Sequence, residues 1–148
     1  MTTATDKRLR RGESALAEEG LMLQLSQLAD ACANGHPGLE PAAIETASGL
    51  VALLLPAARV DRIPALLAAR ATESAALALV PEEAGYMLSR GSSGWHVASF
   101  VLPGLEDEVT AEGPTMALAL VGAIASALRA AMQAGTLSAY PAAGARVN

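Results

Sequence analysis

The 148-residue sequence predicts an α+β fold, in which N-terminal helices precede a small three-stranded antiparallel sheet and a C-terminal helix. Three observations predict it. Apolar residues recur at helical spacing as far as Pro56, two runs of β-forming residues flank a glycine-bounded turn after Pro81, and helical spacing returns after Pro114. A chain of this length buries about two-thirds of its unfolded-chain surface as one domain.

The first helix is predicted over Ser14 to Ala33, with Asn34-Gly35 as its stop. Residues at helical spacing predict its buried face, namely Leu16, Leu21, Leu25, Leu28 and Cys32. A second helix is expected from Pro41, a favoured first-turn residue, to about Leu55, where Pro56 ends it.

Residues 62–80 predict short helical segments, and the pattern leaves open whether they form one helix or two. Asp61 is the expected cap of the first segment, which has Pro64 in its first turn. Thr72 or Ser74 is the expected cap of "SAALALV" before Pro81.

A β-hairpin is predicted by "YMLSR", the turn "GSSG" and "WHVASFVL", and residues 107–112, "DEVTAE", predict a third, charged edge strand. Both faces of the second strand carry apolar side chains. A sheet that is apolar on both sides needs a cover on both sides. We therefore expect the N-terminal helices on one face of the sheet and the last helix on the other.

The last helix is predicted over residues 114–134, with Pro114 in its first position. One stripe runs along it at spacings of 3, 4, 3 and 4, formed by Leu118, Val121, Ala125, Leu128 and Met132. Its unbroken apolar run is about ten residues, whereas a membrane span needs about 20. The pattern favours a buried helix, and its small residues allow close approach of the sheet or of the same helix in a second copy.

These elements divide the chain into four predicted segments. We expect a disordered basic tip over 1–12, a helical region over 13–60, a sandwich-like α-β-β-β-α domain over 61–135 and a flexible tail over 136–148.

Charge is distributed unevenly along the chain. Residues 6–11, "DKRLRR", carry +3, which leaves −8 on the rest of a chain whose net charge is −5. An acidic body with 3% aromatic residues disfavours nucleic-acid binding, although the basic tip keeps it as an alternative. Size, acidity and mixed α/β content also fit an acidic secretion-type chaperone. The N-terminus lacks a signal-peptide pattern, so we expect a cytoplasmic protein.

The residue types that carry chemistry are sparse. Cys32 with His36 would give a metal ion only two ligands. The acids in and beside the third strand, Glu106, Asp107, Glu108 and Glu112, lack the pattern of a calcium loop. Neither a phosphate-binding glycine motif nor a G-x-S-x-G elbow occurs. The sequence predicts no catalytic residue, cofactor or metal. An enzyme or ligand-binding protein would need Trp95, His96 and the acidic strand in one pocket.

Three segments, "ATESAALALVPEEAGYMLSR", "WHVASFV" and "AEGPTMALALVGAIASALRAA", resemble the phage ABA sandwich domain family over residues 70–132. The matches fall at Thr72, at 74–82, at Pro114 and at 117–120. The chain departs from the family in its Pro114-Thr115 order and in Val121, where a cysteine is common. The resemblance implies a phage or prophage origin and carries over no thiol chemistry.

Together these features predict a non-enzymatic phage- or prophage-derived accessory protein that acts through protein–protein contacts. Its expected partner is another protein, with a homodimer as one option, and not a membrane. The expected interaction surface combines the start of the second strand with the small-residue face of the last helix, namely Trp95, His96, Leu118, Val121, Gly122 and Ala125.

Overall fold

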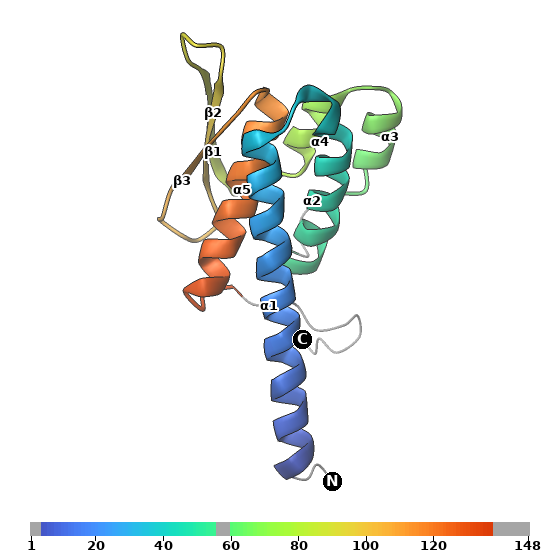
Figure 1. Cartoon of the computed structure of the whole chain (residues 1–148), viewed down its shortest axis with the longest axis vertical. Helices are drawn as coiled ribbons and strands as arrows, with labels where there is room; N and C mark the ends of the chain where they lie inside the picture. The colour runs from blue at the N-terminus through green and yellow to red at the C-terminus, as the bar shows by residue number, and fades with distance from the viewer. Residues whose placement is uncertain (1–3, 56–59, 138–148) are drawn as a thin grey trace.

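A computed structural model of the chain describes residues 4–55 and 60–137 and confirms the α+β fold (Figure 1). Residues 62–80 form two helices rather than one. In chain order the elements are α1 (Ala4–Asn34), a 3₁₀ turn (Pro37–Leu39), α2 (Glu40–Leu54), α3 (Ile63–Ala68), α4 (Thr72–Ala78), β1 (Gly85–Arg90), β2 (His96–Val101), β3 (Val109–Gly113) and α5 (Met116–Gln133).

The strands form an antiparallel sheet in the order β1-β2-β3, so the predicted hairpin and edge strand are confirmed. Phe100 of β2 lies opposite Tyr86 of β1 and Val109 of β3. The hairpin turn closes with the Gly91 amide donating to the Trp95 carbonyl at 2.8 Å. Gly94 has a φ of 89°, which favours glycine. The third strand begins at Val109, two residues later than predicted.

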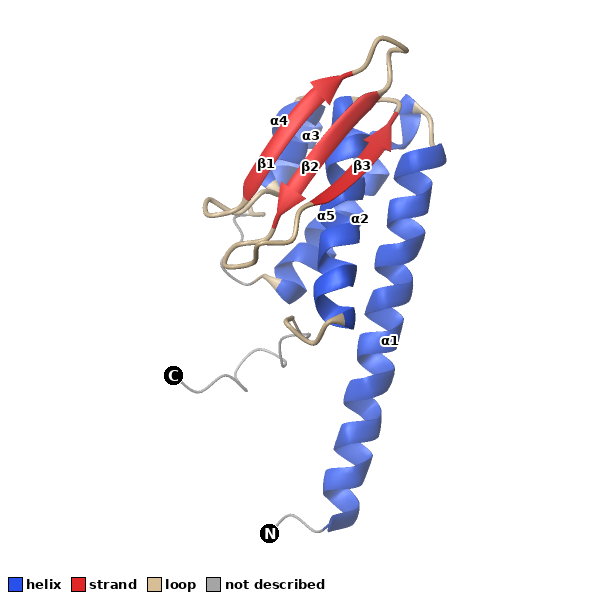
Figure 2. Cartoon of the chain, turned by 90° about the vertical axis from the view of Figure 1, so that its left-hand side faces the viewer, coloured by secondary structure: helices blue, strands red, loops and turns tan. Residues whose placement is uncertain are grey.

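Helices lie against only one face of the sheet, so the expected cover on the second face is wrong (Figure 2). Ala98 and Phe100 point to the helical layer and are fully buried, whereas Met87 on the outer face is 64% exposed. Neighbouring strands place Ser, Thr and Glu beside the apolar residues of β2 on that outer face. The face is therefore mixed in polarity, as in a half-solvated antiparallel sheet. The sequence of the second strand alone could not show the polarity of this face, because the polar residues come from the neighbouring strands.

Helix α5 is the centre of the core, and its predicted stripe is buried as expected. It packs on β2 and β3 on one side and on α1 and α2 on the other. By length and composition it is the one helix among the described residues that could cross a membrane. However, 72% of it is buried inside the fold. Its burial is that of a core helix in a water-soluble protein.

A single hydrophobic core joins the two halves of the chain, so the predicted boundary at residue 60 does not divide the structure. Leu25 of α1, Ile44 of α2 and Phe100 of β2 all belong to one buried cluster with α5. The layers are one sheet and one group of helices, not a separate sandwich over 61–135. The predicted flexible tail falls mainly on 138–148, outside the described residues, whereas Thr136 donates its hydroxyl to the Ala131 carbonyl at 3.0 Å.

Helix α1 begins at Ala4, so residues 4–12 are helical and the predicted disordered tip is wrong there; residues 1–3 lie outside the described residues. The segment contains three Arg, one Lys, one Leu and one Ala and lacks Pro, and these residues favour helix despite their charge. Only Leu25, Leu28 and Cys32 of α1 are buried. The predicted burial of Leu16 is wrong, because the helix extends beyond the body at that point.

Several predicted helix caps are displaced by one or more residues. Arg62 and Ala71 occupy the N-cap positions of α3 and α4 without a side-chain cap bond, in place of Asp61 and of Thr72 or Ser74. Helix α5 begins after Thr115, so Pro114 precedes the cap instead of forming the first turn. The Thr115 hydroxyl accepts from the Leu118 amide at 3.2 Å and donates to the Glu40 carboxylate at 3.0 Å.

We expect Thr115→Ala to lower the free energy of unfolding by about 1–2 kcal/mol, because it removes the cap of α5 and the bond from α5 to α2 together. Thr115→Ser keeps the hydroxyl and is the matched control. Urea unfolding of both variants measures the effect. Equal stability of the alanine and serine variants would contradict the role given to the hydroxyl.

Candidate interaction surfaces

Four of the six predicted interaction residues are buried in the core, so their assignment to a surface is wrong. Leu118, Val121 and Ala125 are at most 1% exposed. Gly122 is buried as well, and a Cβ there would lie 3.3 Å from Cys32 Cβ and 3.7 Å from Ala111 Cβ. The small residues of α5 thus allow close approach of α1 and β3 from the same chain.

The remaining two predicted residues, Trp95 and His96, are not brought together. Successive residues of a strand point to opposite faces. Trp95, 44% exposed, lines a hollow with Val97 and Glu112, whereas His96 lines a different hollow. The pocket that would unite Trp95, His96 and the acidic strand is therefore not formed by the described residues.

The hollow beside His96 lies where α5 begins and is mostly polar. It is lined by residues that include Glu40, Arg70, Ser74 and Thr115. Glu40 and Thr115 bond to each other there, which assigns them a structural role. Arg70 has a φ of 59°, which is uncommon for a residue with a side chain. Within residues 4–55 and 60–137, no three His, Cys, Asp or Glu side chains gather to hold a metal ion.

Cys32 is a core residue and not part of a site with His36. It is fully buried, and burial raises the pKa of its thiol from 9.0 to about 12. The thiolate is the reactive form, so the folded protein holds this group unreactive at neutral pH.

We expect the aromatic disulfide DTNB to react with Cys32 at pH 8 at least about a hundredfold more slowly in the folded protein than in denaturant. Because the unfolded thiol releases its proton above pH 9 and the folded thiol does not, the free energy of unfolding should also fall as pH rises above about 9. The absorbance of the thiolate that DTNB releases, followed over time with and without denaturant, measures the two labelling rates. Fast labelling of the folded protein would contradict the buried position.

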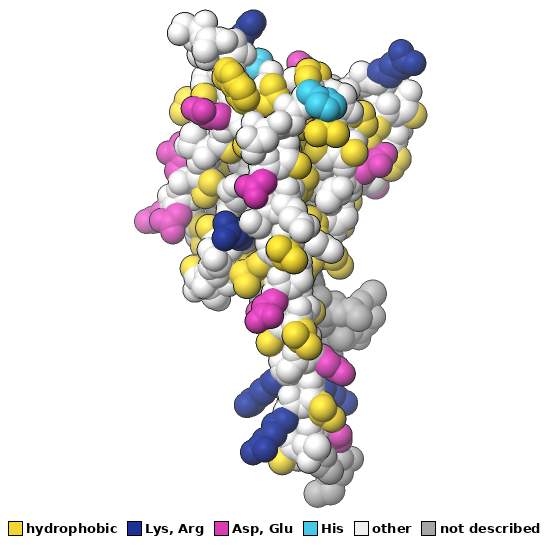
Figure 3. All heavy atoms as spheres, in the orientation of Figure 1, with side chains coloured by type: hydrophobic (Ala, Val, Ile, Leu, Met, Phe, Trp, Pro, Cys, Tyr) yellow, Lys and Arg dark blue, Asp and Glu magenta, His cyan; other side chains and the backbone are white. Residues whose placement is uncertain are grey.

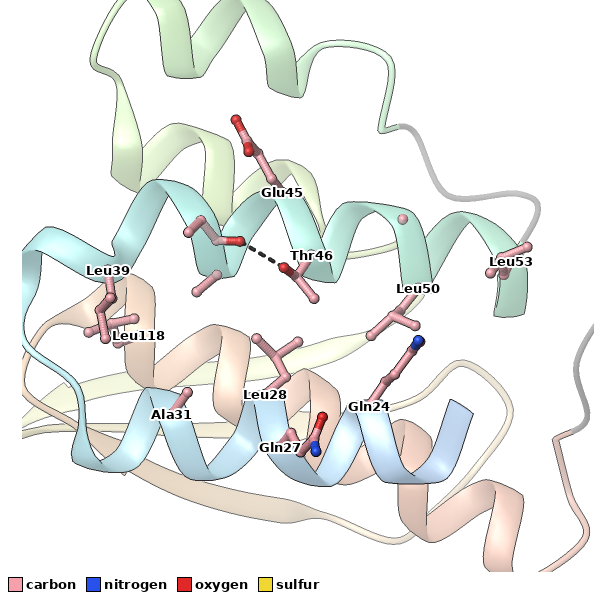
Figure 4. Close-up of a pocket in the computed structure, with 13 residues that line it drawn as sticks. Gln24, Gln27, Leu28, Ala31, Leu39, Glu45, Thr46, Leu50, Leu53 and Leu118 are labelled. Atoms are coloured by element: carbon pink, nitrogen blue, oxygen red, sulfur yellow. Dashed lines mark hydrogen bonds between the residues drawn. The ribbon is translucent and has the colours of Figure 1, made fainter. Parts of the chain in front are cut away.

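A groove of about 600 Å³ runs between α1 and α2 (Figure 4). Leu28 and Leu50 point into it from the two helices, and Leu118 of α5 lies beside Leu39 at one end. Both helices supply its walls; α1 supplies Gln24, Gln27 and Ala31, and α2 supplies Ala42, Thr46, Gly49 and Leu53. The groove is thus an open, largely apolar channel parallel to two helices.

The α2 wall of this groove carries a hydroxyl group that already has a hydrogen-bond partner within the helix. The Thr46 hydroxyl donates to the Ala42 carbonyl one turn earlier at 3.0 Å (Figure 4). This bond leaves less polar surface facing the groove. Leu53 at one end is 52% exposed and Leu39 at the other is 36% exposed. An apolar channel with these properties suits an amphipathic helix.

The N-terminal half of α1, residues 4–20, projects beyond the body (Figure 1). Every residue in it except Glu18 is exposed. Three leucines follow one another at intervals of seven, namely Leu9 and Leu16 in this half and Leu23 just after it. Their side chains are 61%, 69% and 59% exposed, respectively. A seven-residue interval keeps side chains near one face of a helix. We call these three residues the leucine stripe.

Basic side chains gather near the free end of α1, whereas acidic side chains are spread over the body (Figure 3). The basic groups belong to Lys7, Arg8, Arg10 and Arg11. At 100° per residue all four lie away from the leucine stripe. The projecting half therefore carries the leucine stripe on one face, with Glu13 close to it, and its basic side chains lie away from the stripe.

Comparisons with protein-family models, with curated proteins and with solved structures found no match to this chain. The resemblance to the phage ABA sandwich family therefore stays a prediction. It marks residues of the core, because the matching positions 117–120 of α5 are buried.

Sequence reasoning missed both the groove and the leucine stripe. A signal for the stripe exists, since the interval of seven between its leucines is visible in the sequence. The groove left no such signal, because its walls come from two helices whose packing only the structure defines.

Proposed function

We propose that the chain is a cytoplasmic, phage- or prophage-derived accessory protein that acts through protein–protein contacts and catalyses no reaction. The observation that supports this most is the apolar surface left uncovered on α1 and in the α1–α2 groove. Contiguous exposed apolar surface with a polar rim is typical of protein interaction sites. The resemblance of residues 70–132 adds the expectation of a phage origin.

The genes beside the coding sequence test the origin. Tail, capsid or integrase genes would support the proposal, whereas a secretion operon would favour the acidic chaperone that the sequence leaves as the alternative. The two readings also differ in partner, because a chaperone of this kind binds an effector encoded with it.

Co-purification with each neighbouring gene product, expressed one at a time, tests the contact. We expect at least one phage-encoded product to form a complex of fixed stoichiometry with the chain. A locus without phage genes would contradict the origin, and a chain that binds neither a neighbouring product nor a second copy of itself would contradict the proposal.

A further inference from the structure

The projecting half of α1 lacks the packing that normally holds a helix. Residues 4–20 continue a helix that residues 21–34 hold against the body, so the cost of nucleation is met, but two glycines and the lack of packing leave this half of the helix little stability of its own. No Cβ at Gly12 or Gly20 would meet an atom within 4 Å. Packing against another molecule would supply what this helix lacks.

The leucine stripe lies in line with the α1 wall of the groove. From Leu23, steps of four residues lead to Gln27 and Ala31, which line the groove, so they share its face of the helix. Gly20 lies on the same face between Leu16 and Leu23. A second α1 that packed antiparallel along this face would therefore enter the groove with its own stripe turned inward.

If the two α1 helices cross at Gly20, the projecting half of one copy matches the groove of the other in length and in register. Residues 4–20 span about 25 Å and the 15 residues of α2 span about 22 Å. An antiparallel crossing at Gly20 places Leu16 level with Gln24 of the second copy and Leu9 level with its Ala31. Both of these residues line the groove. The glycine would let the two helices approach closely where they cross.

Charge favours the same arrangement. The basic tip carries +3 and the rest of the chain −8. Glu45 is the one charged side chain among the residues that line the groove. The acidic and basic groups lie outside the apolar contact, where they set orientation more than affinity.

We propose that the α1–α2 groove binds residues 4–20 of a second copy of this chain, so that two copies exchange their α1 ends around a two-fold axis near Gly20. The interface is isologous, since each copy gives one helix end and one groove. The pairing of two copies names a partner for the proposed function and rests on that function's protein–protein contacts. The two proposals can still fail separately, because self-association does not depend on whether the gene lies in a phage locus.

Light scattering after gel filtration at about 10 µM tests this, and we expect the mass of two 15.0 kDa chains. A triple variant, Leu9→Gln with Leu16→Gln and Leu23→Gln, should have the mass of one chain. It should also lose helical circular dichroism from residues 4–20. Leu77→Gln, which changes a 36% exposed leucine of α4, is the matched control and should stay paired.

A second variant tests the groove from the other side. Gly49→Lys places a long cationic side chain in the α2 wall, where a Cβ meets no atom within 4 Å, and replaces glycine by a better helix former. We expect single chains whose fold is intact by thermal melting. A wild-type chain of single mass, or paired chains in the triple variant or in Gly49→Lys, would overturn the proposal.

Discussion

Replacing Phe100 with alanine should lower the free energy of unfolding by about 3–5 kcal/mol. Phe100 is the single phenylalanine of the chain and the largest of the fully buried side chains, on the face of β2 that packs on α5. The helices around it are rich in alanine, whose short side chains cannot move into the space left. The variant therefore keeps a cavity and loses the contacts of an aromatic ring. Urea unfolding at one protein concentration measures the loss.

Tyr86→Ala is the control for that experiment. Tyr86 is the cross-strand neighbour of Phe100 in β1, but it is 50% exposed at the sheet edge. Its removal should cost about 1 kcal/mol or less, since half of the residue already contacts water. Similar losses in the two variants would mean that the sheet face towards α5 is not the core that the structure shows.

The second large effect is expected from Gly113→Ala, at the end of β3. A Cβ at this position would lie 2.8 Å from the Ala119 nitrogen and 3.2 Å from Ala119 Cα. Both atoms belong to the backbone of α5 and cannot rotate away. The added methyl must push the sheet from the helix, so we expect a loss of about 1–3 kcal/mol.

Gly49→Ala makes the same chemical change where space is open. Nothing lies within 4 Å of a Cβ on Gly49, which is inside α2. Alanine there should raise stability by about 0.5–1 kcal/mol through its better helix propensity. The two variants should thus shift the urea midpoint in opposite directions. A Gly113→Ala variant as stable as the wild type would contradict the close approach of β3 to α5.

The parts of the fold that depend on local signals could be predicted from the sequence. Gly91 and Gly94 mark the hairpin turn, and the spacing of Leu118, Val121 and Ala125 identifies α5 as buried. Such signals act within a few residues, where backbone geometry and side-chain periodicity decide the structure. They do not require knowledge of which element packs on which.

The parts that depend on neighbours in space could not be predicted. Apolar residues on both faces of β2 suggested two covers, but Ser89 and Glu112 beside Val97 make its outer face mixed. In the same way, the small-residue face of α5 could not reveal whether its own chain or a second copy covers it. The structure shows that Cys32 and Ala111 of the same chain lie against Gly122.

Disulfide cross-linking of Gly20→Cys tests the exchange of α1 ends most directly. Native Cys32 is the single cysteine of the chain and is buried, so the introduced thiol is the reactive one. We predict covalent pairs for Gly20→Cys under mild oxidation, and none for Glu18→Cys, on the opposite face, or for Leu9→Cys, whose two copies would lie about 33 Å apart. Pairs through position 9, or none through position 20, would contradict the antiparallel exchange.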